Sequence, residues 1–262
     1  MYPTAMDLFS HAAGQLPSQS PLSERLRPKS LDEIVGQEKT IGLQSRLGKL
    51  IRSGHIPSLI LWGPPGTGKT TFALALAQQT GAFFMNLNAV DSGAKALREA
   101  GESGRERRLL HQQRTVLFVD EIHRFNRAQQ DVLLPYVEKG DLILVGATTE
   151  NPSYELNRAL LSRCRVVVFE RLTDEALREL FRRAFESARI EAEEALSPEA
   201  AEWLISAADG DGRRLLNSIE VILAAREGNA PPLSAPDVRE LVQDTPLAHD
   251  KSSEMHYDLV SA

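Results

Sequence analysis

Residues 63–70 read Gly-Pro-Pro-Gly-Thr-Gly-Lys-Thr, which is a complete G-x-x-x-x-G-K-[ST] pattern. The pattern follows the apolar run 59–62 and opens an amphipathic stretch, 71–79. A strand, a glycine-rich loop and a helix in this order form a phosphate-binding loop, in which backbone N–H groups and the helix N-terminus face the phosphates. The stretch therefore predicts an α/β fold that binds a nucleoside triphosphate.

Two side chains of this loop are expected to act directly. Lys69 is expected to reach the β- and γ-phosphates of ATP, and the Thr70 hydroxyl is expected to bind Mg²⁺. The remaining predicted nucleotide contacts come from the loop and the residue that follows it: Gly63, Pro64, Pro65, Gly66, Thr67, Gly68 and Thr71.

The composition is that of a soluble globular protein with an uneven charge distribution. The chain has 262 residues, of which 42% are hydrophobic and 25% charged, and its net charge is −6. Residues 186–262 carry six Lys/Arg against sixteen Asp/Glu, whereas residues 1–185 carry 24 against 20. A single cysteine, Cys164, excludes an internal disulfide framework and is typical of a reducing compartment. Since no membrane span or signal segment is visible, we expect a cytoplasmic protein.

Short β-rich runs alternate with helical segments as far as residue 171, and only helices follow. The β-runs are 58–62, 82–87, 115–119, 142–147 and 165–169, and the later helices are 173–189, 198–208, 213–227 and 235–243, with Thr173 and Ser197 as N-caps. Apolar strands separated by helices indicate a parallel sheet covered on both faces. We predict a flexible arm (1–20), a nucleotide-binding domain with a five-stranded parallel sheet flanked by helices (21–171), and a small all-α lid domain (172–245).

The third β-run leads directly into two acids, Asp120 and Glu121. In an open α/β sheet, ligands lie at the carboxyl ends of the strands. We expect Asp120 to bind Mg²⁺ and Glu121 to polarise the attacking water. The fourth run is followed by Thr148 and Thr149, and we favour Thr149 as the hydroxyl that senses the γ-phosphate; the alternative is a strand-end pair that satisfies backbone groups. His123 has no second metal ligand at helical spacing, so we interpret it as a polar residue that couples the site to its neighbour.

Several motifs together resemble one family. The resemblance to AAA+ ATPases of the clamp-loader clade lies in Gly63–Thr70, Phe118–His123, Gly146–Pro152 and Leu161–Cys164. A narrower similarity, to the family of replication-associated recombination protein A and the Werner-interacting ATPases, lies in Leu61–Thr71, His123–Asn126, Gln129–Asp131 and Thr149–Leu156. The resemblance covers nearly the whole chain from about Leu22 and implies a P-loop AAA+ fold that hydrolyses ATP.

The resemblance also implies an oligomer. Arg163, within Ser162-Arg163-Cys164, is similar to the clamp-loader arginine that completes the site of a neighbouring subunit in trans. Such an arginine finger stabilises the negative charge of the transition state. Members of the family continue beyond the point at which this chain stops, and residues 246–262 resemble the start of their tetramer-forming region. Tetramer assembly by this chain is therefore left open.

Other nucleotide contacts are implied by the same resemblance. Arg213 lies in the segment 211–217, which is similar to the lid segment that contacts the γ-phosphate in cis. Arg27, Pro28 and Val35 lie in segments similar to the N-terminal linker that surrounds the adenine.

A basic stretch follows the second β-run. Residues 95–127 carry eight Lys/Arg and five Asp/Glu. In clamp-loader relatives, helices at this place contact DNA phosphates, so the resemblance implies sequence-independent DNA contacts at Ser92, Lys95 and Arg98. The alternative is a solvated helix face, because glutamates are interleaved with the basic residues.

The predicted function is a DNA-dependent ATPase of replication-fork maintenance, recombination and repair, which remodels DNA or protein–DNA complexes at ends, gaps or stalled forks. It would work as a homo-oligomer in the bacterial cytosol, associated with the nucleoid, with single-strand-binding protein or a sliding clamp as a further partner. One alternative is a clamp-loader subunit that uses ATP to hold a sliding clamp. Another is a branch-migration motor or protein unfoldase, against which stands the clamp-loader type of the Ser-Arg-Cys triplet.

Overall fold

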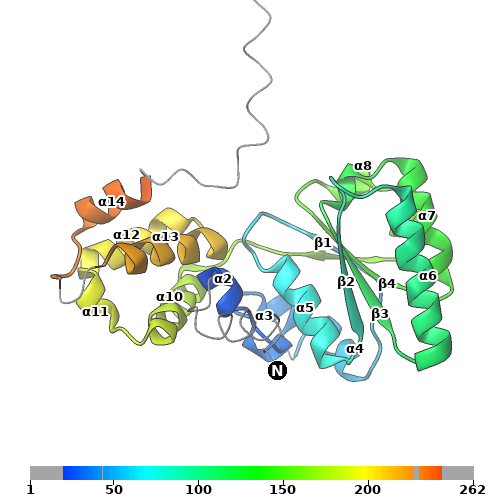
Figure 1. Ribbon diagram of the computed structural model, residues 1–262, viewed down its shortest axis with the longest axis horizontal. Helices are drawn as coiled ribbons and strands as arrows, with labels where there is room; N and C mark the ends of the chain where they lie inside the picture. Colours follow the sequence, from blue (N-terminus) through cyan, green and yellow to red (C-terminus); the bar gives the residue numbers. More distant parts are fainter. Residues whose placement is uncertain (1–19, 43, 227–229, 244–262) are drawn as a thin grey trace, which may run out of the picture.

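The computed structural model describes residues 20–42, 44–226 and 230–243, and it shows a helix-flanked sheet beside a group of helices (Figure 1). Residues 1–19 of the predicted arm and the segment 246–262 lie outside the described residues. Among the helices that are described, none combines the length and the apolarity needed to cross a membrane.

All strand pairs of the five-stranded sheet are parallel, and the strand order is β2-β3-β4-β1-β5. The strands are β1 (Leu59–Trp62), β2 (Phe83–Asn88), β3 (Thr115–Asp120), β4 (Ile143–Thr148) and β5 (Arg165–Val168). Each lies within one residue of its predicted run, so the predicted fold class is confirmed. Because the strands are parallel, the loop after β1 and the acids after β3 lie at the same edge of the sheet.

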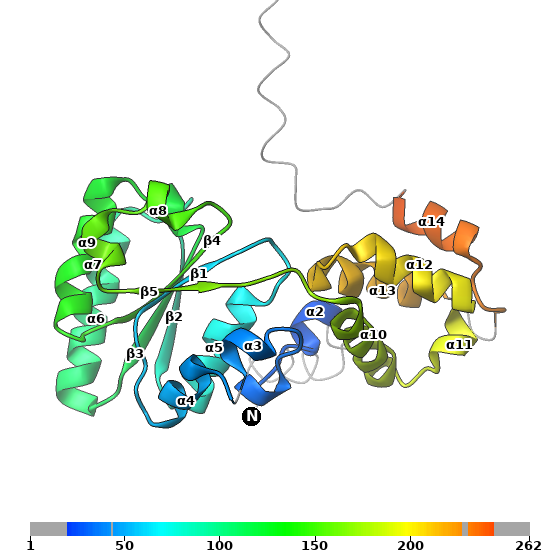
Figure 2. The same cartoon turned by 180° about the vertical axis from the view of Figure 1, so that it is seen from behind.

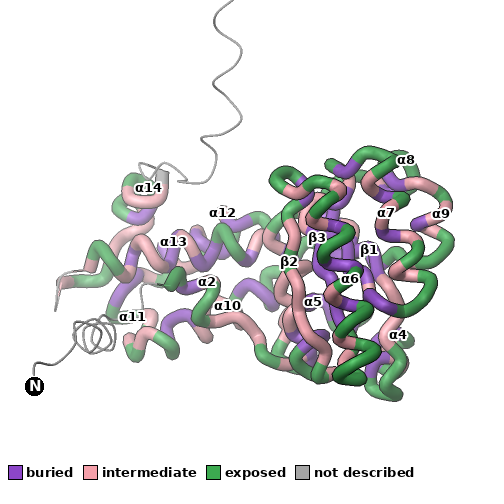
Figure 3. The backbone as a smooth tube through the Cα atoms, turned by 45° about the vertical axis from the view of Figure 1, so that its right-hand side comes forward, coloured by how far each residue is buried: buried purple, intermediate pink, exposed green. Residues whose placement is uncertain are grey.

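Two apolar cores cover the two faces of this sheet. The helices around the sheet are α3 (Glu38–Ile41), α4 (Arg46–Arg52), α5 (Lys69–Gln79), α6 (Ala94–His111), η2 (Ile122–Arg124), α7 (Arg127–Glu138), α8 (Pro152–Glu155) and α9 (Arg158–Leu161). Helices α3, α4 and α5 pack on one face, and α6 to α9 pack on the other. Figure 3 shows β1 and β3 as buried, whereas the edge strand β2 is only partly buried.

Helix α5 is more completely buried than the predicted amphipathic stretch 71–79. Phe72, Ala73, Ala75, Leu76 and Ala77 are all buried, because the helix is covered by the sheet on one side and by the N-terminal part of the chain on another.

A third core lies in the helical group, which contains α10 (Asp174–Ala188), α11 (Ala192–Ala195), α12 (Pro198–Ala208), α13 (Gly212–Ala225) and α14 (Ala235–Gln243). The predicted N-caps are confirmed: Thr173 accepts a hydrogen bond from Ala176 N, and Ser197 accepts one from Ala200 N. Strand β5 is an edge strand, and the chain runs from it into this group (Figure 2).

The N-terminal segment joins both units. It forms α2 (Leu22–Arg25) and η1 (Leu31–Glu33). Leu22 is buried in the helical core, and its N–H donates to Glu220 Oε1 of α13 at 2.8 Å, whereas Leu31 is buried in the core of the sheet. A domain boundary at residue 171 stays a prediction.

Candidate active site

The phosphate-binding loop connects β1 to α5 and depends on glycine at several points. Gly66 and Gly68 have φ values of +68° and +95°, a region that is unstrained only for glycine. A Cβ on Gly66 would lie 1.7 Å from Asp211 Oδ1, so the present position of the Asp211 carboxylate also requires glycine here. The Thr67 hydroxyl donates to Pro64 O at 2.9 Å and closes the loop on itself.

The Lys69 ammonium group lies against the backbone of this loop. It donates to Gly63 O and Pro64 O, both at 2.7 Å. Burial lowers the pKa of Lys69, and the nearby carboxylates of Glu121 and Asp120 oppose that shift. The loop therefore presents a cation at the point where the phosphates of a nucleotide would meet it.

The two acids follow β3 as predicted. Asp120 ends the strand, and its Oδ1 accepts a hydrogen bond from Glu121 N at 3.1 Å. Glu121 has a φ of +52°, in the left-handed region. For a residue with a Cβ this conformation costs roughly 1 kcal/mol, a kind of strain that gathers at functional sites. Both carboxylates line the same pocket as Lys69.

The two threonines after β4 have different surroundings. Thr149 is exposed and lines the pocket, whereas Thr148 is buried. The Thr148 hydroxyl lies 2.9 Å from His123 Nδ1 and accepts from Glu150 N at 3.0 Å. Thr149 is therefore the hydroxyl that is free to face a nucleotide, which agrees with the predicted preference; its role stays a prediction.

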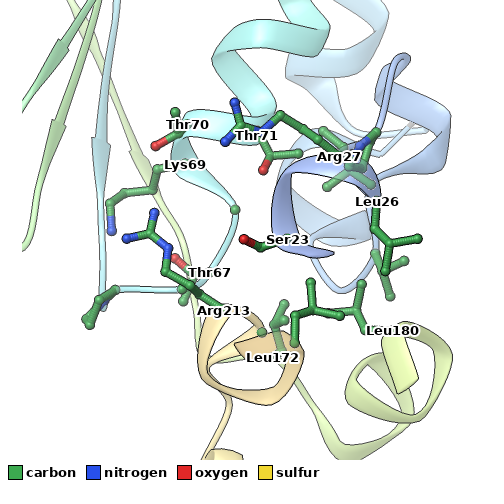
Figure 4. Close-up of a pocket in the computed structure, with 18 of the residues that line it drawn as sticks. Ser23, Leu26, Arg27, Thr67, Lys69, Thr70, Thr71, Leu172, Leu180 and Arg213 are labelled. Atoms are coloured by element: carbon green, nitrogen blue, oxygen red, sulfur yellow. The ribbon is translucent and has the colours of Figure 1, made fainter. Parts of the chain in front are cut away.

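Helix α13 brings Arg213 to the pocket. Asp211 caps this helix by accepting from Arg214 N at 2.9 Å, and Gly212 N donates to Gly66 O of the loop at 3.1 Å. Figure 4 shows that Arg213 and Lys69 extend into the same part of the pocket, from two different units of the fold. A phosphate there would meet two cations.

The other end of the pocket is apolar, and Leu26, Leu172 and Leu180 are seen there in Figure 4. The predicted residues Arg27, Pro28 and Val35 line the pocket, together with residues that sequence reasoning missed: Ser23, Leu26, Ile34, Leu172, Leu180, Gly212 and Leu216. In the sequence these leucines are indistinguishable from core residues of helices. An apolar wall of this kind suits the flat face of a nucleobase.

Buried Gln37 holds the N-terminal segment over the loop. Its Nε2 donates to Thr67 O at 3.3 Å and to Glu170 O at 2.8 Å, and its Oε1 accepts from Glu170 N at 3.4 Å. One side chain thus joins the N-terminal segment, the loop and the strand-to-helix connection after β5.

The other residues predicted to act in the site do not line this pocket in the part of the chain that the structure describes. Gly63 and Pro64 supply carbonyl oxygens to Lys69 instead. Arg163 forms an ion pair with Glu138 at 2.5 Å and donates to Ala159 O and Ser162 Oγ. Of the predicted DNA contacts, Ser92 precedes α6, and Lys95 and Arg98 lie near its N-terminal end.

The residues of the pocket fit a Mg²⁺ ion that is bound together with a nucleotide. The Thr70 hydroxyl and the Asp120 carboxylate line one pocket, and both are oxygen ligands. Mg²⁺ is usually held by one or two carboxylates with water and substrate phosphates. No cluster of three or more His, Cys, Asp or Glu occurs within the described ranges, so they hold no metal cage built from such side chains alone.

Comparison with known families agrees with this geometry. Residues 59–172 match the ATPase family associated with various cellular activities (AAA), and residues 191–262 match the AAA C-terminal domain. The chain belongs to the AAA ATPase family. The segment of the family match contains the loop, both acids and Thr149, which contribute to the pocket.

Relatives narrow the assignment within the AAA family. The chain is 42% identical over 251 residues to replication-associated recombination protein A of Haemophilus influenzae, covering 92% of this chain and 55% of that protein. It is 39% identical over 248 residues to the protein of the same name from Escherichia coli K12, with the same two coverages. It is 39% identical to the ATPase WRNIP1 of Dictyostelium discoideum, covering 94% of this chain and 30% of that protein. The predicted resemblance is confirmed, and the chain spans about half the length of its bacterial relatives.

Among solved structures, the chain resembles the RuvB Holliday junction branch migration motor of Thermotoga maritima. The TM-score is 0.63 at 26% identity, and the match covers 83% of this chain and 72% of that one. This similarity confirms the AAA fold, including its helical C-terminal region.

Proposed function

We propose that the chain is a DNA-dependent ATPase that acts in replication-fork maintenance, recombination and repair. The observation that carries the proposal is the convergence of Lys69, Glu121, Thr149 and Arg213 on one pocket. The names of two bacterial relatives support a role in replication and recombination, because both proteins are called replication-associated recombination protein A. The remodelling of DNA or protein–DNA complexes at ends, gaps or stalled forks, in the cytosol and at the nucleoid, belongs to the same proposal.

The pocket supports hydrolysis in a direct way. The nucleobase would lie against the leucines, and the phosphates would lie between the loop, Lys69 and Arg213. Thr70 and Asp120 would hold Mg²⁺, which neutralises charge on the phosphates. Glu121 would orient a water and take its proton as the water oxygen bonds to the γ-phosphorus, while the bond from that phosphorus to the ADP oxygen breaks.

We propose that Arg163 acts in the nucleotide pocket of a neighbouring copy of the chain. It lies outside the pocket of its own chain and is 35% exposed at its side chain, with Glu138 as its ionic partner. An exposed ion pair is weak enough to exchange for a phosphate of a second subunit. We therefore propose a homo-oligomer in which each pocket is completed in trans.

DNA contact is proposed for the start of α6. The Lys95 side chain is 90% exposed and lies 3.8 Å from Glu99, so its charge is available to a phosphate. Arg98 is also exposed, one turn further along the helix. Contacts of this kind bind DNA without reading its sequence and weaken as salt rises. Single-strand-binding protein or a sliding clamp remain proposed partners.

The test is the ATPase rate with single-stranded, duplex, gapped and four-way-junction DNA. Stimulation by ends or gaps supports the proposal, stimulation only with a sliding clamp favours a clamp-loader subunit, and stimulation only by junctions favours a branch-migration motor. Glu121→Gln should keep ATP binding and abolish turnover. Normal turnover by Glu121→Gln would contradict the hydrolytic role of this pocket.

A further inference from the structure

His123 connects the proposed water-activating acid to the tip of a neighbouring strand. Its Nδ1 lies 3.2 Å from Glu121 Oε2 and 2.9 Å from Thr148 Oγ1. The His123 side chain is only 10% exposed. It is held in the short helix η2, directly after the acids, and thus at a fixed place beside them.

The partners of His123 determine which of its atoms carries the proton. A carboxylate can only accept, so the contact with Glu121 requires a proton on Nδ1. Thr148 Oγ1 accepts from Glu150 N at 3.0 Å and lies 3.3 Å from Glu150 O, to which its own proton can go. When Nδ1 donates to both oxygens, His123 Nδ1, Glu121 Oε2 and Thr148 Oγ1 are therefore all paired.

This contact leaves Glu121 facing the nucleotide pocket. Glu121 lines the pocket and acts on the charge of Lys69, while its Oε2 is held by His123. The second carboxylate oxygen is thus available to a water. Thr148 is paired with Trp62 in the sheet, and its carbonyl accepts from Gly63 N at 3.2 Å. The imidazole therefore ties the acid to the strand tip that carries Thr149 and to the first residue of the loop.

We propose that His123 is a positioning residue, which holds Glu121 in the orientation that activates water and couples it to the end of β4. This inference rests on the proposed hydrolysis. His123 exchanges no proton with the substrate in this role. Its Nδ1–H restricts the rotamer of a carboxylate whose backbone is already in the left-handed region, and it makes that rotamer depend on the position of Thr148.

Two isosteres separate this role from a packing role. The amide nitrogen of Asn lies near the position of Nδ1, whereas that of Gln lies near Nε2. We expect His123→Ala to lower kcat about tenfold or more and to leave the dissociation constant for ATP within twofold. His123→Asn should restore most of kcat, and His123→Gln should not. If His123→Ala fails to fold, the comparison of Asn with Gln, at matched melting temperatures, decides the question.

Thr148 supplies a second arm of the test. Thr148→Val removes the hydroxyl at nearly constant volume and should lower kcat several-fold, whereas Thr148→Ser should keep it. In single-turnover measurements, His123→Ala should cause no further loss when Glu121 is already Gln, because the two residues act as one unit. Equal kcat for the Asn and Gln variants, or additive losses in the double variant, would overturn the inference.

The Glu121→Gln variant separates the two proposals. If its turnover is normal, the proposed function fails. If it has no turnover while His123→Ala and His123→Gln hydrolyse ATP at the wild-type rate, the proposed function stands and only the role of His123 is overturned.

Discussion

The pocket and the region around Arg163 place their charged groups in different ways. In the pocket, Lys69, Glu121 and Arg213 come from three separate parts of the chain and converge on one point. Arg163, by contrast, is turned toward its own surface and is paired with Glu138. One chain therefore provides nearly a whole nucleotide site together with an arginine that this site does not use. This difference is what the proposed contact between two chains would explain.

The largest expected effect concerns the pocket side of this comparison. Gly66→Ala should remove most ATP binding, because its new Cβ would collide with the Asp211 carboxylate, which must then turn away and give up its cap bond to Arg214 N. Gly140→Ala is a matched control: Gly140 has nearly the same φ, +67°, but nothing lies within 4 Å of its added Cβ. The control should lose roughly 1 kcal/mol of unfolding free energy and keep ATP affinity. Calorimetric titration with ATP measures both variants, and unchanged affinity in Gly66→Ala would contradict the described loop.

A smaller effect is expected on the arginine side. Arg163→Ala should keep ATP affinity and lower turnover about 10³-fold, since a finger stabilises the transition state and not the bound ground state. Mixing this variant with Lys69→Ala chains should restore activity, because each mixed contact can pair an intact pocket with an intact finger. Arg158→Ala, at an exposed arginine in the adjacent helix α9, is the control and should be silent. Weakened ATP binding by Arg163→Ala would place Arg163 in its own pocket.

The smallest effect concerns the ion pair that holds the finger. Glu138→Gln should raise turnover at low chain concentration by at most about fivefold, because an exposed ion pair contributes up to about 1 kcal/mol. Glu202→Gln is the control, since Glu202 pairs with Arg178 at 2.7 Å in the helical group and away from the finger. Reduced turnover in Glu138→Gln would mean that the pair orients Arg163 for its task.

Local patterns in the sequence predicted most of the sheet and half of the site. The strands were predictable because buried parallel strands are short apolar runs, and the loop because only glycine tolerates its conformation. The apolar wall was not predictable, since Leu172 and Leu180 meet Leu26 only after the helical group has packed against the N-terminal segment. The same holds for the contacts His123–Thr148 and Glu138–Arg163: each joins residues that are 25 positions apart along the chain, and no local pattern specifies it.

The central claim is that a pocket of one chain is completed by the arginine of another. Turnover per chain, measured against chain concentration together with mass in solution, tests this claim most directly. We predict that turnover per chain rises with the fraction of assembled chains, and that Arg163→Ala stays low at every concentration. Full turnover per chain in a sample that consists of monomers would contradict the account.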